Sequence, residues 1–296
     1  MSNLLFLNKR KKEFEARLQK SLCGFGEETS LKKACSYALL SEGKRFRPLI
    51  VLLVAEALGA DAPWDAALSV EYFHTASLIA DDLPCMDDDD ERRGKKSLHQ
   101  EFGEPIALLS SYALITKAFE KIHDASKSLK GGQDQIALIA LKTASELAGI
   151  KGATKGQFFD IFPPEANLDR IKEVLYLKTV TLFEVSFIFG WLFGSGDIKK
   201  IEEVKRLAYH FGMAFQISDD IRDFSEDSKK GEGMNMAIHL GVEKAKDCFF
   251  EELELAKKQL EKLQLNSEAL LKIFSLLQKR LERVHPKGLI SHDFSA

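Results

Sequence analysis

Short breaks rich in glycine, proline and acidic residues divide the chain into segments that each have the length of a helix. These segments lie near residues 5–22, 28–40, 47–58, 65–81, 106–123, 134–149, 168–193, 202–221 and 242–261. In one of them Leu207, Phe211, Ala214, Phe215 and Ser218 recur at helical spacing. No long stretch alternates with the period of two that is typical of a strand. We therefore predict an all-α helical bundle of about ten helices around a central cavity.

Length and composition favour one domain. The 296 residues are 45% hydrophobic, which is enough for one large core. We predict a single domain over residues 1–296, with an N-terminal helix or arm at 1–25 and a flexible loop at 225–236 that covers the functional site. The formal net charge of -3 gives no general attraction to nucleic acid, so no nucleic-acid partner is expected.

The apolar segments indicate a cytoplasmic protein without a transmembrane segment. The longest strongly apolar runs, 49–55 and 185–193, are far shorter than the ~20 residues that span a bilayer. The apolar run Leu4 to Leu7 is too short for the core of a signal peptide. The four cysteines are widely spaced, which fits reduced thiols.

Two acidic clusters are the strongest functional signals. The first contains Asp81, Asp82 and Asp87, and Pro84 predicts that the preceding helix ends or kinks there. Gathered carboxylates repel one another unless cations lie between them, and Mg²⁺ prefers one or two carboxylates together with phosphate oxygens. Asp88 is a further candidate for an outer, supporting role.

The second cluster lies on one helical face. Gln216, Asp219, Asp220 and Asp223 follow the spacing i, i+3, i+4, i+7. Like charges at this spacing, at the C-terminal end of a helix dipole, are destabilising unless a cation is bound. A solvated acidic helix end is the alternative. Facing each other, the two clusters would form a magnesium-bridged diphosphate site.

Basic residues supply the complementary charge. Lys44, Arg45 and Arg47 precede an apolar helix, with Pro48 suited to its first turn. Arginine forks match phosphate oxygens. Short basic runs, including Arg92 and Arg93, are usually plain surface, and the lone histidine that shares a helix face with Asp81 is more often structural.

These pieces, in this order, resemble the trans-prenyl diphosphate synthases, the family of farnesyl and geranylgeranyl diphosphate synthases. The resemblance extends from about residue 31 to residue 246. The stretch 77–94 is similar to the family's first aspartate-rich motif in its bacterial and plant form, and 211–223 is similar to the second.

The resemblance implies a role for each matching residue. Metal ligands would be Asp81, Asp82, Asp87, Asp219, Asp220 and Asp223. The allylic diphosphate would be bound by Arg92, Lys178, Lys229 and Lys230. Isopentenyl diphosphate would be bound by Lys44, Arg47, His74 and Arg93. The catalytic groups would be Asp81, Asp87, Lys178, Thr179 and Gln216, with Gln157, Asp160 and Ser77 elsewhere in the pocket.

The implied activity is a Mg²⁺-dependent prenyl transfer, for which Mn²⁺ is a possible substitute metal. Isopentenyl diphosphate would condense head-to-tail with dimethylallyl, geranyl or farnesyl diphosphate, after Mg²⁺ and cationic groups help the allylic diphosphate to leave. The resemblance also implies a homodimer. Two alternatives are a terpene cyclase, and a regulatory homologue with little or no activity.

Product length depends on the residues upstream of the first cluster. Ala76 is small, so Phe73, one turn further away, would form the floor of the product tunnel, together with Tyr112. This favours a twenty-carbon over a fifteen-carbon product, unless these side chains are plain core packing.

Three departures from the family pattern favour low activity or an unusual substrate. Ala80 replaces a usual histidine, and Ser110-Ser111-Tyr112 replaces a usual Gly-Asp. The stretch 233–237 has no lysine where the family has a diphosphate ligand.

Overall fold

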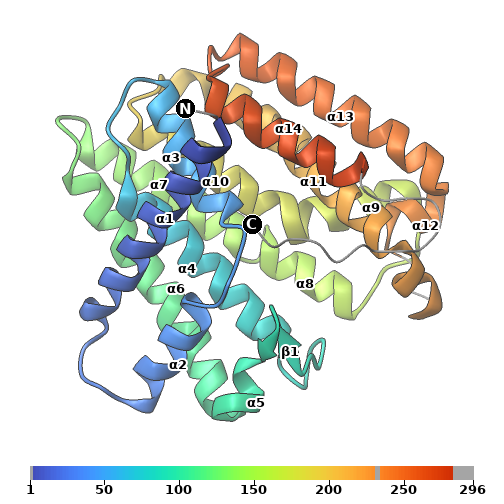
Figure 1. Cartoon of the computed structure of the whole chain (residues 1–296), viewed down its shortest axis with the longest axis horizontal. Coiled ribbons are helices and arrows are strands. Elements are labelled where there is room, and N and C mark those ends of the chain that lie inside the picture. The colour runs from blue at the N-terminus through green and yellow to red at the C-terminus, as the bar shows by residue number, and fades with distance from the viewer. Residues whose placement is uncertain (1–2, 231–233, 283–296) are drawn as a thin grey trace.

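The computed structural model describes residues 3–230 and 234–282, and these are mostly helical (Figure 1). The longer helices are α1 (Asn3–Ser21), α2 (Ser30–Leu39), α3 (Phe46–Ala57), α4 (Trp64–Asp81), α6 (Glu104–Lys127), α7 (Gln133–Ala148), α8 (Ala153–Ile161), α9 (Leu168–Leu175), α10 (Thr181–Phe193), α11 (Ile201–Lys230), α13 (Val242–Lys262) and α14 (Glu268–Glu282). The remaining elements are short: α5 (Leu98–Phe102), α12 (Met236–Leu240), 3-10 turns at Leu22–Phe25 and Ile198–Lys200, a π-helix at Tyr176–Val180, and a hairpin of β1 (Glu91–Arg92) and β2 (Lys95–Lys96). The predicted all-α class is confirmed.

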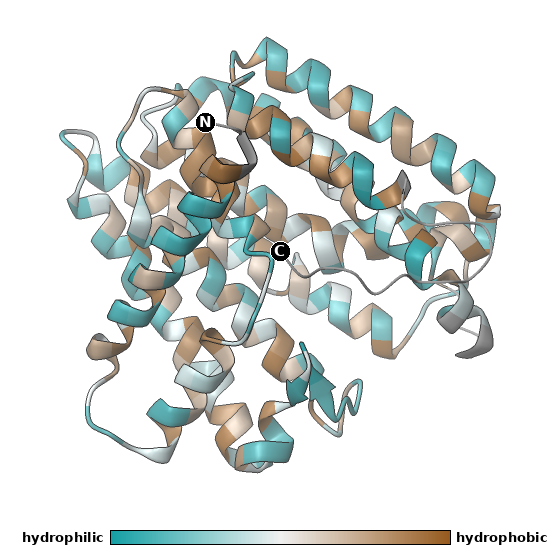
Figure 2. Cartoon of the chain, viewed as in Figure 1, coloured by the Kyte–Doolittle hydropathy of each residue, from teal (hydrophilic) through white to brown (hydrophobic). Residues whose placement is uncertain are grey.

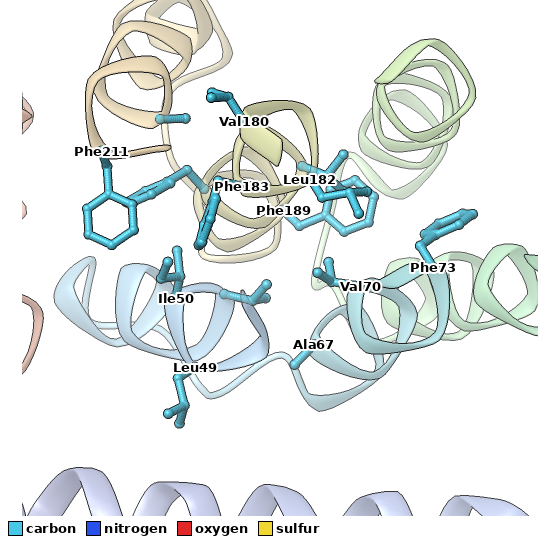
Figure 3. Close-up of a cluster of buried hydrophobic side chains, with 14 of the residues drawn as sticks. Leu49, Ile50, Ala67, Val70, Phe73, Val180, Leu182, Phe183, Phe189 and Phe211 are labelled. Atoms are coloured by element: carbon cyan, nitrogen blue, oxygen red, sulfur yellow. The ribbon is translucent and has the colours of Figure 1, made fainter. Parts of the chain in front are cut away.

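Helix α10 forms the centre of the core. All of its residues are buried, and it packs against α3, α4, α7 and α11. Figure 3 shows Phe183 and Phe189 of α10 between Ile50 of α3, Val70 of α4 and Phe211 of α11. Burying each such side chain contributes roughly 1.5–3 kcal/mol, so this contact region holds together the helices that carry the site.

The helix that contains α10 is long and apolar enough to cross a membrane by length and composition alone. It runs from Leu168 to Phe193, and 83% of its most apolar window is buried inside the protein. Burial of this kind is typical of a core helix. Among the described residues, it is the one helix that meets these criteria.

The C-terminal helices are amphipathic (Figure 2). On α13 the buried residues form one stripe: Ala245, Phe249, Leu253, Ala256 and Leu260. This stripe packs along α11, while the opposite face of α13 is charged. The turns of α14 likewise bury Ile273, Phe274 and Leu277. Helix α14 also packs on α11, and this contact brings the C-terminal region to the second acidic cluster.

Most predicted helices lie where the periodicity placed them, and the 1–25 arm is α1 with the following 3-10 turn. The predicted loop at 225–236 differs. Residues 225–230 continue α11, and α12 begins at Met236. Residues 231–233, in the middle of the predicted loop, lie outside the described residues. The helices α5, α8, α12 and α14, the hairpin, the π-helix and the 3-10 turn at Ile198–Lys200 were not predicted.

Candidate active site

The first acidic cluster lies on the turn that follows α4. The helix ends at Asp81, and the backbone N–H of Asp87 donates to the Asp81 carbonyl at 2.9 Å. This closed turn brings the Asp81 and Asp87 side chains to the same place, as the break at Pro84 predicted. Burial raises the pKa of Asp81 to about 7, although Lys178 acts in the opposite direction. Burial raises the pKa of Asp87 as well, so both carboxylates would be stabilised by a bound cation.

Asp82, the next residue after Asp81, is paired with Arg92. Its side chain is buried, and its Oδ1 accepts a hydrogen bond from Arg92 Nε at 2.8 Å and another from Nη2. Arg92 Nη2 also donates to Asp89 at 2.7 Å. The hairpin of β1 and β2 holds Arg92 in this position. Asp82, a predicted metal ligand, therefore contacts a predicted diphosphate ligand in this structure.

A π-helix (Tyr176–Val180) joins α9 to α10 and connects the first cluster to the second. Gln157 on α8 donates to Asp87 at 3.4 Å, and Lys178 forms an ion pair with Asp160, also on α8. Burial lowers the pKa of Lys178, but the charges of Asp160, Asp87 and Asp81 raise it on balance, so this amine stays cationic. The next residue, Thr179, donates to the Gln216 side-chain carbonyl at 2.6 Å.

The second cluster is formed by the last turns of α11. Gln216 donates to Asp220 Oδ1 at 2.8 Å, and the backbone N–H of Met236 donates to Asp220 Oδ2 at 2.8 Å. Both oxygens of this predicted metal ligand are therefore engaged by the protein. Burial raises the pKa of Asp220 to about 7, although these two hydrogen bonds lower it. Asn235 donates to the Asp220 carbonyl at 3.0 Å, and it also caps α12.

Asp219 is surrounded by arginines. Its Oδ1 lies 2.5 Å from Arg280 Nη2 on α14 and 3.4 Å from Arg222 Nη1. The same oxygen accepts no hydrogen bond of good geometry, so a buried acceptor is left without a properly directed donor. Asp223 pairs with Arg222 at 2.8 Å. Here guanidinium groups lie where the sequence predicts metal ions.

The four residues predicted to bind isopentenyl diphosphate belong to one basic group beside the second cluster. Arg47 Nη1 lies 3.4 Å from His74 Nε2, and the Arg47 guanidinium stacks on Phe183 at 4.3 Å. Burial, and then the charges of Arg47 and Arg93, lower the pKa of His74 well below its usual value. The histidine is thus a neutral hydrogen-bonding group.

The other two basic residues of this group are Arg93 and Lys44. A Cβ at Gly43 would lie 2.8 Å from Arg93 Nη1, so glycine makes room for this guanidinium. Burial lowers the pKa of Lys44, and so do the nearby charges of Arg280 and Arg222. Mutual repulsion of these cations is relieved when an anion binds among them.

Arg45 has a different role from its basic neighbours. Its backbone is left-handed, with φ of 53°, and its buried guanidinium pairs with Glu71 and donates to the carbonyls of Leu39 and Ser41. The side chain of Arg45 therefore holds the loop from inside the protein.

The predicted chain-length residues lie in different surroundings. Phe73 is buried and packs edge-on against Phe119 of α6, with ring centroids 5.2 Å apart. Ala76 is buried, and its carbonyl accepts a hydrogen bond from Ser111 at 2.9 Å. Tyr112 is 57% exposed on the outer side of α6, so it does not join Phe73 and Ala76 in the interior.

The predicted pocket residue Ser77 donates to the His74 carbonyl within α4 at 2.9 Å. Lys229 and Lys230 lie at the end of α11, and their side chains are outside the described part of the structure.

The acidic residues fit metal ions that are shared with a ligand. Within residues 3–230 and 234–282, no three Asp, Glu, His or Cys side chains are grouped closely enough to hold a metal ion by themselves. In the second cluster, however, Asp219 Oδ1 lacks a properly directed donor. Phosphate oxygens from a substrate would complete the coordination of Mg²⁺ in such a site.

Sequence reasoning missed Arg280 and Asn235. Arg280 lies in the last turn of α14, 61 residues after Asp219, and its sequence surroundings are those of an ordinary amphipathic helix. Asn235 directly precedes α12, where an asparagine is a standard N-cap signal. The N-cap was therefore detectable, but its contact with Asp220 was not.

Known proteins share this sequence and architecture. The sequence model of the family described as "Polyprenyl synthetase" matches residues 28–241. The chain is 33% identical over 290 residues to the farnesyl diphosphate synthase of Geobacillus stearothermophilus, covering 93% of this chain and 97% of that protein. It is 38% identical over 211 residues to geranylgeranyl pyrophosphate synthase 11, chloroplastic, of Arabidopsis thaliana. That match covers 69% of this chain and 58% of the Arabidopsis protein, so the chain spans little more than half of the plant relative's length.

Comparison with solved structures also finds a prenyl-transferring enzyme of similar fold. The geranyltransferase from Legionella pneumophila superposes with a TM-score of 0.84 at 26% identity, covering 94% of this chain and 97% of that one. Together with the paired acidic clusters and the basic group, these matches show that the chain belongs to the polyprenyl synthetase family of trans-isoprenyl diphosphate synthases.

Proposed function

We propose that the protein is a short-chain prenyl diphosphate synthase. It condenses isopentenyl diphosphate with an allylic diphosphate (dimethylallyl, geranyl or farnesyl) and releases diphosphate. The observation that carries this proposal is the arrangement of two acidic clusters, joined by way of Lys178, Thr179 and Gln216, with one basic group beside the second cluster. A site of this kind holds two diphosphates, one through metal ions and one through cationic side chains.

The allylic diphosphate would lie between the two acidic clusters. Asp81 and Asp87 on one side and Asp219 on the other would hold Mg²⁺, while Lys178 binds the phosphate oxygens directly. When bound, Mg²⁺ draws charge from the departing diphosphate and favours cleavage of the allylic carbon–oxygen bond. Lys229 and Lys230 remain proposed ligands of the same group.

The second diphosphate would occupy the basic group. Lys44, Arg47 and Arg93 supply positive charge, and neutral His74 supplies a hydrogen bond. The positively charged groups of this site repel one another in the free protein. Binding of a diphosphate therefore relieves this repulsion and also adds favourable contacts.

The reacting carbons would lie beside Thr179 and Gln216. Their side chains are joined to each other and present oxygen atoms, which stabilise positive charge on carbon without forming a bond to it. The departed diphosphate would take the proton that the new product loses. The apolar walls contributed by Phe183 and Phe215 help to exclude water.

We further propose a twenty-carbon product. Small Ala76 leaves room below the first cluster, and Phe73, held edge-on by Phe119, is the first bulky side chain beyond it. Tyr112 has no part in this floor, because it is exposed.

Dimer formation and a cytoplasmic location stay predictions. In support of a homodimer, α6 exposes Leu108, Leu109, Tyr112 and Ile115, and three of these share one helical face. A second copy of the chain that packs through α6 would cover them.

The direct test is a product analysis. Purified protein, Mg²⁺ and labelled isopentenyl diphosphate are incubated with each allylic diphosphate in turn, and the dephosphorylated products are identified by chain length. Linear C20 alcohol is expected, Mn²⁺ should substitute, and EDTA should abolish the reaction. If the products stop at C15, the protein is still a prenyl diphosphate synthase, but the small side chain of Ala76 does not set a twenty-carbon product.

Two outcomes would overturn the proposal. No product with any primer would favour the non-catalytic regulatory homologue. A cyclic hydrocarbon formed without isopentenyl diphosphate would favour a terpene cyclase, which has no use for the basic group of Lys44, Arg47, His74 and Arg93.

A further inference from the structure

A π-helix is an unusual element, and this one carries two residues of the site. Residues Tyr176–Val180 form the π-helical turn, and the Thr181 N–H donates to the Tyr176 carbonyl, an i to i−5 bond. Such a turn inserts one residue into an α-helix and is less stable than the regular form. Loss of the insertion would rotate Lys178 and Thr179 relative to the helix before or after it. Other interactions must therefore stabilise the π-helical turn against the regular α-helix.

A partly buried hydrogen bond spans the π-helical turn. The Tyr176 hydroxyl donates to Glu184 Oε2 at 2.9 Å. Glu184 lies in the first turn of α10 and is only 4% exposed. Burial raises the pKa of Tyr176, and so does the Glu184 carboxylate, so the phenol stays a donor. A buried carboxylate in an apolar helix costs stability unless it is satisfied, and Tyr176 is the side chain that satisfies it.

Helical geometry shows that this bond depends on the π-helical turn. Eight residues of regular α-helix would turn Glu184 about 80° away from the face of Tyr176. One inserted residue makes the pair equivalent to seven residues, which leaves the two faces about 20° apart. The hydrogen bond thus forms in the π-helical register and is lost in the α-helical one.

The π-helical turn also packs closely against the backbone of α8. A Cβ at Gly156 of α8 would lie 2.4 Å from the Lys178 backbone nitrogen and 2.6 Å from the Leu177 carbonyl carbon. The backbone of α8 therefore supports the turn from one side. Leu177 and Val180 within the turn are buried as well.

We propose that Tyr176 and Glu184 are positioning residues, whose hydrogen bond holds the π-helical register and so places Lys178 and Thr179 in the active site. Neither residue would touch substrate. The proposal rests on the prenyl-transfer function proposed above. It predicts that the pair controls the allylic half of the site and leaves the basic group unaffected, since Lys44, Arg47, His74 and Arg93 come from other elements.

The test compares four variants: Tyr176→Phe, Glu184→Leu, Glu184→Gln and Tyr209→Phe. Tyr176→Phe and Glu184→Leu remove the bond, whereas Glu184→Gln keeps an acceptor for the phenol. Tyr209→Phe is the matched control, because Tyr209 packs on Tyr176 with ring centroids 5.9 Å apart but does not bridge the turn.

Removing the bond should lower kcat/KM for the allylic diphosphate about 10- to 100-fold, the cost of a small misplacement of catalytic groups. The KM for isopentenyl diphosphate should stay unchanged. Glu184→Gln and Tyr209→Phe should resemble the unaltered protein. Equal effects on both substrates, failure of Glu184→Gln to preserve activity, or equal losses in Tyr176→Phe and Tyr209→Phe would overturn the proposal.

A second measurement does not depend on activity. Hydrogen exchange of the amides at residues 177–184 should be faster in Tyr176→Phe than in Tyr209→Phe. An unaltered protein that forms no prenyl product would count against the proposed function alone. Unchanged exchange in Tyr176→Phe would count against the positioning role alone.

Discussion

The first acidic cluster lies on a turn after a helix end, whereas the second lies within an uninterrupted helix. At the first, the bond from Asp87 N–H to the Asp81 carbonyl brings the carboxylates together within seven residues. At the second, helical spacing aligns the carboxylates, but Met236 and Arg280 from other elements contact them, and Asn235 donates to the backbone carbonyl of Asp220.

The two clusters show two ways in which a protein can hold mutually repelling carboxylates together before a metal ion binds. The turn of the first cluster leaves Asp81 and Asp87 with raised pKa values, and Arg92 neutralises Asp82. The second cluster relies on guanidinium groups and backbone N–H donors brought in by the fold. The first is organised by local backbone chemistry, and the second by packing of α14 and the segment before α12.

The largest expected effect is on catalysis. Asp81→Asn and Asp219→Asn should each lower kcat/KM about 100- to 1000-fold, because each removes charge that holds the cations at the leaving group. Both should also raise the Mg²⁺ concentration needed for half-maximal rate, as measured by steady-state kinetics. Glu91→Gln, on the exposed hairpin strand, is the control and should be unaffected. A normal Mg²⁺ dependence in Asp219→Asn would show that the two clusters are not equivalent metal sites.

A smaller effect is expected on stability against pH. In the folded protein the pKa values of Asp81 and Asp220 are both about 7, above the ordinary aspartate value of 3.8. Between these values the folded protein binds more protons than the unfolded chain, so its free energy of unfolding should fall as the pH rises from 4 to 7. For buried Asp220 the slope approaches ~1.4 kcal/mol per pH unit.

Urea unfolding in EDTA at several pH values measures this slope. Asp220→Asn should flatten it by removing one titrating group from the second cluster, and Asp81→Asn should do so for the first. If only Asp81→Asn flattens it, the hydrogen bonds from Met236 and Gln216 keep Asp220 ionised throughout.

The smallest effect is expected from Pro84→Ala, which tests whether the backbone hydrogen bond alone positions the carboxylates of the first cluster. Pro84→Ala should lower the free energy of unfolding by about 0.4–1 kcal/mol, mainly because the unfolded chain gains freedom. Activity should change little, since the bond from Asp87 N–H to the Asp81 carbonyl remains. Thermal unfolding and product formation measure the two quantities. A large loss of activity would mean that Pro84 itself sets the positions of the carboxylates.

Much of this protein follows from its sequence alone. Apolar residues at helical spacing predicted most helices, because that spacing is set by the backbone within a few residues. The end of α4 at Asp81 followed from Pro84, and the common face of Asp219, Asp220 and Asp223 followed from their spacing. The family resemblance assigned the basic group, although no local rule joins Lys44 to Arg93.

Only the tertiary structure decided which distant groups meet. The contact of Arg280 with Asp219 depends on how α14 packs on α11, and the exposure of Tyr112 depends on which face α6 turns toward the core. The π-helical turn at Tyr176 depends on a hydrogen bond to Glu184 and on the backbone of α8. Helix periodicity is a short-range property of the backbone, whereas these contacts result from burying apolar faces of segments far apart in the sequence.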